Sequence, residues 1–352
     1  MYRGNWRGIR ETYEAWWARG LERPVFQVYY PAAGNGAAVE FDQWSFLKYK
    51  DNLGHLRRLL EAFADSGCCA GDAFPGLFLN LGPGVLAACF SGYLDYDDFN
   101  QTAWFEKPQS WEEVEELAFE ETNHWWQYLQ SVTRMCADAA KDRFILGMTD
   151  IGGILDVLAS LRGTENLLMD LLSVPDRVNR MRRRLLEGWH RAYDALAPII
   201  AGVQQGTSSW LRIWCPGRYY PFQCDFCAMI SPAMFESFVV PDVQEQCRRL
   251  GHGIYHLDGP GQVAHVDLLL EIPELDGIQW VPGSGNPQCD SPRYFPMYEK
   301  ILGKGKLLVL QSFDDWRNIP GMLKALPNRG LLFSVNVANR EEAREFLESV
   351  GM

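Results

Sequence analysis

The stretch GIYHLDGPG, residues 253–261, carries the pattern that decides the predicted fold. A run of β-branched and aromatic residues ends in polar side chains, and a turn rich in glycine and proline follows it. This order is typical of a strand that leads into a helix, so it predicts a strand at 254–258. The same order recurs in the carboxyl half and predicts further strands at 221–225, 278–282, 307–311 and 331–335.

Helix signals follow these strands. Ser231 can cap a helix start and Pro232 suits the first helical position, so we expect a helix that continues through 234–250. Asn339 can cap a last helix near 339–350, and the acidic first turn of that helix suits the positive end of its dipole. The carboxyl half is therefore predicted to consist of repeated βα units.

The amino half adds three predicted strands, at 25–30, 77–81 and 144–149. Helical stretches at 44–66, 111–140 and 155–196 lie between and after them. Three strands and five make the eight that a (β/α)8 TIM barrel needs. We therefore expect an α/β fold, a single TIM barrel over residues 1–352, with amino-terminal helical additions and a hairpin arm at 210–214 before the fourth strand.

Charge and composition limit the partners. With 33 Lys and Arg against 45 Asp and Glu, the net charge of -12 disfavours nucleic acid. No stretch approaches the ~18 apolar residues of a membrane span, and nine scattered cysteines are typical of reduced core thiols. We expect a cytoplasmic enzyme that acts on a small molecule and binds neither nucleic acid nor membranes. Its aromatic-rich stretches favour a homodimer.

A barrel places its active site at the carboxyl ends of its strands, which directs attention to His256 and Asp258. Alternate residues of a strand point the same way, so an imidazole and a carboxylate are expected to lie together. Such a pair suits metal binding or acid–base catalysis. In the alternative interpretation Asp258 only caps the turn before Gly259, and His256 is hydrogen-bonded in the core.

Further polar strand ends complete the predicted site. Asp150 and Asp225 each end an apolar strand, where a buried carboxylate needs a partner, so we expect both to be catalytic beside His256 and Asp258. Cys224 and Cys227 have the spacing of a zinc or redox pair but lack a second pair, which favours structural thiols. The expected substrate contacts are Tyr30, Asn80, Trp104, Arg162, Trp214, Tyr220, Gln279, Trp280, Gln311 and Asn336.

Three segments resemble a known superfamily. Residues 222–241, FQCDFCAMISPAMFESFVVP, resemble the strand-four signature of the uroporphyrinogen-decarboxylase and cobamide-methyltransferase superfamily, in which an acidic strand end precedes an SP-x-x-F-x-x-F helix. Residues 255–260 and 269–283 resemble the next two strands of uncharacterised members. The resemblance covers the carboxyl half closely and the amino half loosely, and it implies a TIM barrel that catalyses either methyl transfer or decarboxylation.

The chain departs from both activities of that superfamily. The decarboxylases carry an arginine-rich segment after the first strand, where residues 23–31 here read RPVFQVYYP. The methyltransferases bind zinc through His-x-Cys on the fifth strand and a cysteine on the eighth. His256 matches the first ligand, Asp258 replaces the second, and the eighth strand ends in Ser334-Val335-Asn336. The resemblance thus implies zinc, or a metal that prefers harder ligands, at His256 and Asp258.

Four functions remain open at this point. The first is methyl transfer between a corrinoid, carried by a partner corrinoid protein, and a small acceptor. The second is a lyase that acts on a carboxylated ring and needs basic residues such as Arg162 or Arg218 in the barrel mouth. The third is glycoside hydrolysis by paired aspartates with tryptophan platforms. The fourth is a ligand-binding barrel without catalysis.

Overall fold

The computed structural model describes residues 5–31, 41–63 and 67–352, which form a mixed α/β fold. Its main sheet has seven strands in the order β2-β1-β11-β10-β9-β8-β7. All neighbouring pairs are parallel except β1 with β2. The strands are β1 (Val25–Pro31), β2 (Gly67–Gly71), β7 (Arg218–Gln223), β8 (Gly251–Asp258), β9 (Gly277–Val281), β10 (Leu307–Leu310) and β11 (Leu331–Asn336).

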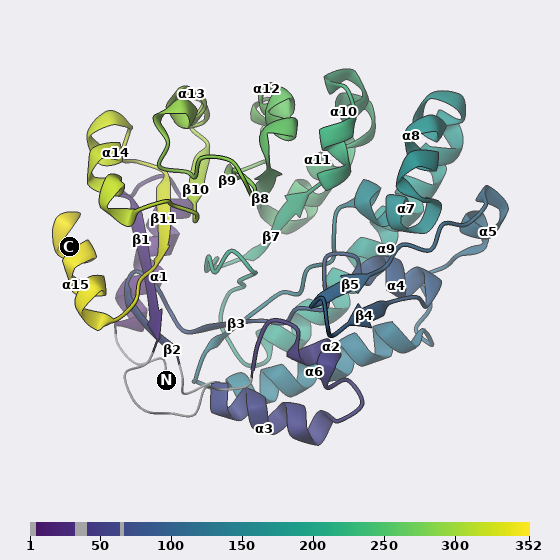
Figure 1. The fold of residues 1–352 in the computed structure, drawn as a ribbon, viewed down its shortest axis with the longest axis horizontal. Helices are drawn as coiled ribbons and strands as arrows, with labels where there is room; N and C mark the ends of the chain where they lie inside the picture. Colours follow the sequence, from purple (N-terminus) through teal and green to yellow (C-terminus); the bar gives the residue numbers. More distant parts are fainter. Residues whose placement is uncertain (1–4, 32–40, 64–66) are drawn as a thin grey trace.

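Two short strand pairs lie outside this sheet. β3 (Gly76–Phe78) pairs in parallel with β6 (Ile145–Gly147), and β4 (Asp95–Asp97) forms an antiparallel hairpin with β5 (Thr102–Trp104). Each of the eight predicted strands therefore has a counterpart. The described strands pair into one main sheet and a separate β3–β6 pair. Figure 1 shows helices α10 to α15 arranged around the outside of the main sheet.

The strand predicted at 221–225 is shifted. β7 starts at Arg218 and ends at Gln223, and the chain then enters the short 3-10 helix η1 (Asp225–Met229). The carboxylate of Asp156 causes this turn, because it accepts the backbone N–H groups of Asp225 and Phe226 at 3.0 and 2.7 Å. Asp225 thus follows the strand instead of ending it.

Most predicted helices exist but are interrupted. The stretch 155–196 divides at Gly163, whose φ of 89° does not fit a helix, and again before Pro175. The predicted caps are confirmed: Ser231 accepts from Met234 N–H and Asn339 from Glu342 N–H. The helices are α1 (Trp6–Trp17), α2 (Ser45–Lys48), α3 (Leu53–Phe63), α4 (Val85–Ser91), α5 (Trp111–Glu116), α6 (His124–Ala140), α7 (Ile154–Arg162), α8 (Thr164–Ser173), α9 (Pro175–Ala201), α10 (Pro232–Phe238), α11 (Val240–Leu250), α12 (Val266–Leu270), α13 (Phe295–Gly303), α14 (Ile319–Ala325) and α15 (Arg340–Ser349).

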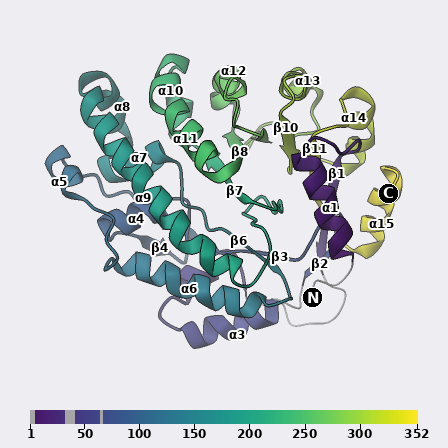
Figure 2. The same cartoon turned by 180° about the vertical axis from the view of Figure 1, so that it is seen from behind.

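An inner core lies on the concave side of the strands. One cluster of fully buried side chains contains Ile145 of β6 together with Ile254 of β8, Leu307 of β10 and Leu332 of β11. Helix α1 covers this cluster at the amino-terminal ends of the strands, where Trp16 Nε1 donates to Leu331 O at 3.2 Å. In Figure 2 α1 lies beside β1 and β11.

The segment 204–216 replaces the predicted hairpin arm. It contains a single antiparallel bridge, Thr207 with Cys215, and no strand. Two of its carbonyl groups instead accept from side chains of the sheet region: Arg212 O from Gln27 Nε2 at 2.6 Å and Leu211 O from Gln311 Nε2 at 2.9 Å. The segment therefore crosses the inner side of the sheet. No helix in the described part of the chain has the length and apolar character that crossing a membrane requires.

Candidate metal centre

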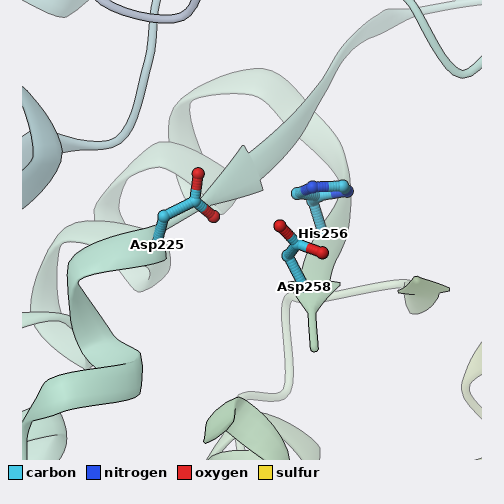
Figure 3. Close-up of side chains that lie close together, drawn as sticks. All are labelled: Asp225, His256 and Asp258. Carbon is cyan, nitrogen blue, oxygen red and sulfur yellow. The ribbon is translucent and has the colours of Figure 1, made fainter. Parts of the chain in front are cut away.

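Three side chains from two adjacent strand ends form the candidate site. His256 and Asp258 come from β8, and Asp225 comes from the start of η1, directly after β7. One ligand atom from each side chain lies within 4.8 Å of the others. Figure 3 shows the two carboxylates turned toward each other, with the imidazole beside them. The predicted pair His256 and Asp258 is therefore joined by the predicted Asp225.

The register of the sheet explains why polar groups gather here. Gln223 of β7 lies beside His256 of β8, which in turn lies beside Gln279 of β9. Because alternate residues of each strand point to the same face, these three side chains form one polar layer above the inner core. His256 thus occupies the centre of this layer.

A directed chain of hydrogen bonds orients the imidazole. The carbonyl of Leu211 can only accept, so Gln311 must present Nε2 to it, at 2.9 Å. Gln311 Oε1 then accepts from Gln279 Nε2 at 2.8 Å, and Gln279 Oε1 faces His256 Nδ1 at 2.5 Å. His256 must therefore carry its proton on Nδ1, which leaves the Nε2 lone pair for a metal or a proton.

Asp225 is held from two sides. Asp156 fixes its backbone N–H, and Gln262 Nε2 lies 3.5 Å from its carboxylate. Gln262 is fully buried, so packing limits the movement of this amide. The Asp225 side chain itself is exposed. It is the ligand of the three that solvent and a substrate reach most easily.

The electrostatics of the site favour a cation. Packing of protein atoms around the carboxyl raises the pKa of Asp225, His256 lowers this pKa, and the charge of Asp258 raises it again. Burial also raises the pKa of Asp156, and the negative charge of Asp225 adds to that rise. Burial is the larger cause of both rises, and the neighbouring carboxylates add to it. A divalent cation between the carboxylates would relieve their repulsion.

The donor set fits such a cation. Ligand atoms that share a cation at about 2.1 Å lie about 3 to 4 Å from one another. The observed limit of 4.8 Å requires only small side-chain rotations, which the exposed Asp225 can make. One imidazole nitrogen and two carboxylate oxygens suit zinc, manganese or ferrous iron better than a thiolate-selective metal. The three donors thus include no thiolate.

Four other predicted residues lie in the network around the centre. Gln279 and Gln311 form the chain to His256. Asp150 is buried and accepts from Tyr220 OH at 3.0 Å and from Gly152 N–H at 2.8 Å. Burial raises the pKa of Asp150, whereas these hydrogen bonds and the nearby His256 oppose the rise. The interaction with His256 places Asp150 within electrostatic reach of the centre.

The prediction that tryptophans contact the substrate is wrong for Trp214 and Trp280. Trp280 is fully buried and packs on Tyr294, because it is adjacent to Gln279 on β9 and so points to the opposite face. Trp214 is buried in the inner core, and its Nε1 donates to Gln205 O. The indole beside His256 belongs to Trp210, whose ring centroid lies 6.5 Å from the imidazole.

Two other predicted contacts have structural roles. Arg162 pairs with Asp170 at 2.8 Å, donates to the carbonyl of Gln109 and stacks over Trp111. Asn80 accepts from Gly82 N–H at 2.8 Å and so caps a turn. Neither side chain is shown to face the centre.

The remaining residues predicted to contact the substrate line two cavities. Tyr30 and Asn336 line a cavity of about 380 Å³ together with Arg212. Trp104 lines another, of about 350 Å³, to which Asp225 and Asp156 also contribute. The second cavity is therefore the one that adjoins the candidate metal centre.

The buried pair Cys224 and Cys227 lies next to the centre but outside it. Both thiols are buried, and the hydrogen bond from Cys224 lowers the pKa of Cys227, with His265 acting in the same direction. His265 stacks on Phe235 and faces Cys227 O at 2.9 Å. Within the described residues, the group that could hold a metal contains neither cysteine.

Sequence reasoning missed Asp156, Gln262 and Trp210 as parts of the site. Asp156 lies on helix α7 and Gln262 in the 3-10 helix η2 (Pro260–His265), so neither is at the end of a strand. One signal for Asp156 was its place in the first turn of α7, where an acidic residue indicates the start of a helix. No known protein-family model matches the chain, and no curated protein sequence is significantly similar to it.

Proposed function

We propose that this chain is an enzyme that activates a small substrate at a divalent cation held by Asp225, His256 and Asp258. The observation that carries the proposal is the convergence of three ligand atoms within 4.8 Å at the carboxyl-terminal ends of β7 and β8. Sites at this edge of parallel strands are built in the same way in many unrelated enzymes.

The proposal includes a complete (β/α)8 barrel. Support comes from the inner core, in which Ile145 of β6 packs in one cluster with side chains of β1, β7, β8, β10 and β11. A flat sheet with a detached strand pair would not bring these faces together. Six strands of the main sheet are parallel to one another and β3 is parallel to β6, so eight strands are available for the barrel, whose closure would place β3 and β6 between β7 and the β1–β2 edge.

The bound cation would act as a Lewis acid that polarises an oxygen or thiol group of the substrate. The chain's own residues prepare for this role. The Gln279–Gln311 chain keeps the His256 Nε2 lone pair available, and Gln262 restrains the Asp225 carboxylate. Asp150, whose pKa burial raises, interacts with His256 electrostatically and can hold or release a proton.

The narrower proposal is methyl transfer between a corrinoid, carried by a partner corrinoid protein, and a small acceptor. It rests on the resemblance of residues 222–241 and 255–260 to the uroporphyrinogen-decarboxylase and cobamide-methyltransferase superfamily and on His256, which matches the first zinc ligand of its methyltransferases. The lyase proposal loses its support, because Arg162 pairs with Asp170 and Arg218, at the amino-terminal start of β7, pairs with Asp194.

Glycoside hydrolysis is the second candidate. Retaining glycosidases hold their two carboxyl groups about 5 to 5.5 Å apart. The oxygens of Asp225 and Asp258 lie within 4.8 Å of each other, and the exposed Trp104 lines the adjoining cavity. This candidate needs no metal, which separates it from the first.

Isothermal titration calorimetry of chelator-treated protein with Zn²⁺ and with Mn²⁺ tests whether the three side chains bind a divalent cation. One site per chain is expected in the wild type, and Asp225→Asn, His256→Gln and Asp258→Asn should each weaken it at least tenfold. The matched control Asp138→Asn, an exposed carboxylate on α6, should leave it unchanged. The absence of a site in the wild type, or one that survives all three changes, would refute the proposal.

Activity assays then separate the candidates. Methylcobalamin is mixed with the protein, added metal and a thiol or alcohol acceptor, and its absorption is recorded. An absorption change that reports loss of the methyl group would support methyl transfer. Metal-independent release of nitrophenol from aryl glycosides would instead support hydrolysis. If the protein is inactive in both assays, the metal titration alone tests the proposal of a divalent-cation site.

A further inference from the structure

The cavity beside Asp225 has a distinctive lining. We call it the Trp104 groove; its volume is about 350 Å³, and its lining residues include Trp104, Glu106, Asp156, Asp225 and Met229. Gln223, a member of the polar layer around His256, lines it as well, so the groove opens directly onto the metal centre.

Apolar side chains are unusually exposed along this groove. Trp104 is 54% exposed and Met229 is 50% exposed, although both are large and hydrophobic. Exposed apolar groups that line a hollow beside a polar centre are typical of a ligand site. Phe105, the neighbour of Trp104, is buried instead, because it packs against Gly84, where an added Cβ would lie 2.3 Å from its ring. Trp104 and Glu106 are the exposed members of this segment of the lining.

The charge of the groove has one sign. Glu106, Asp156 and Asp225 contribute carboxyl groups, and none of the lining residues, all of which the structure describes, is Lys, Arg or His. An anionic ligand would meet only repulsion there. A cation with an apolar body would meet carboxylates and the face of an exposed indole, which is the combination that recognises alkylammonium groups.

We propose that the Trp104 groove is the substrate subsite of the metal centre and that it binds a small alkylammonium cation. Trp104 and Met229 contact the alkyl groups, and Glu106 neutralises the charge. The part of the substrate farthest from its ammonium group then lies toward Asp225 and the metal. The position of the reacting end of the substrate rests on the proposed function. The binding of the cation in the groove does not.

Calorimetric titration of chelator-treated protein with choline tests the proposal, and 3,3-dimethyl-1-butanol, which has the same shape without the charge, serves as the matched ligand. Choline should bind, and the neutral analogue should bind at least tenfold more weakly. Trp104→Ala should weaken choline binding at least fivefold and Glu106→Gln at least threefold. Phe99→Ala, which removes a 93% exposed aromatic ring from the same β4–β5 hairpin, should change it less than twofold.

Equal binding of the two ligands, no binding of choline, or choline binding that is indifferent to Trp104→Ala would each overturn the proposal. Because Trp104 and Phe99 are exposed, neither substitution removes core packing, and the thermal unfolding of both variants should match the wild type. A separate metal titration on the same protein distinguishes the failures. Choline binding without a metal site refutes the proposed function alone, and a metal site without choline binding refutes the subsite alone.

Discussion

Replacement of Gln279 tests whether the amide chain really prepares His256 for a metal. Gln279→Met keeps the length of the side chain and removes both hydrogen bonds, the one to His256 Nδ1 and the one to Gln311 Oε1. Loss of a group that orients a ligating imidazole typically weakens metal binding about 10-fold to 100-fold. That factor corresponds to about 1.4 to 2.7 kcal/mol.

The same substitution should lower the free energy of unfolding. Gln279 is buried, whereas His256 and Gln311 are half-buried, so water can replace part of what they lose. A typical hydrogen bond contributes about 0.5 to 1.5 kcal/mol, and the two together give an expected loss of about 2 kcal/mol. Urea denaturation of the metal-free protein measures this loss, and calorimetric titration with Zn²⁺ measures the change in affinity.

Gln279→Glu provides the contrast. A carboxylate still accepts from His256 Nδ1, so metal affinity should equal or exceed that of the wild type. It cannot donate to Gln311 Oε1, so Gln311 either loses that bond or turns and loses its bond to Leu211 O. The expected loss of stability is about 1 kcal/mol. If Gln279→Met binds Zn²⁺ as tightly as the wild type does, the chain does not orient His256 and this reasoning fails.

Three further predictions concern the fold. Gly277→Ala should lower the stability by about 1 to 3 kcal/mol, because the new Cβ would lie 2.4 Å from Leu307 O; Gly321→Ala, in an open part of α14, is the control and should not destabilise the protein. Ser231→Ala should cost about 1 kcal/mol through loss of the bond to Met234 N–H, and Ser231→Asp should restore most of it. Both are measured by chemical denaturation, and a Gly277→Ala variant as stable as the wild type would contradict the packing of β9 on β10. Burial lowers the pKa of His190 to about 4, with Arg249 and Arg218 acting in the same direction and Asp194 opposing them. An unfolded histidine has a pKa of about 6.5, so the stability from neutral His190 is present above that value and falls by about 1.4 kcal/mol per unit as pH decreases toward 4. The unfolding free energy of His190→Gln, measured from pH 7.5 to 4.5, should depend less steeply on pH than that of the wild type, and equal slopes would refute the assignment.

The sequence was sufficient for four strands of the carboxyl half, because each is marked by local chemistry, but it did not indicate β2, β4 or β5. β-branched and aromatic runs ending at polar residues located β8, β9, β10 and β11 within one to three residues. The interruptions of the helices were harder to predict. Gly163 was visible, but a glycine ends a helix only when tertiary packing selects a positive φ, as it does here at 89°.

The site was predicted in part for the same reason. His256 and Asp258 follow from the alternation of one strand, a local property. The same rule should have separated Gln279 from Trp280, because neighbours on β9 face opposite sides. The roles of Asp156, Gln262 and Trp210 depend on contacts between distant segments, which periodicity does not contain.

Anomalous X-ray scattering from a crystal of the Zn²⁺-loaded protein tests the central claim most directly. We predict one strong peak per chain at the zinc edge, about 2.0 to 2.2 Å from His256 Nε2 and from oxygens of Asp225 and Asp258. A fully loaded protein without a peak among these three side chains, or with its peak at other residues, would contradict the assignment of a metal centre to this strand edge.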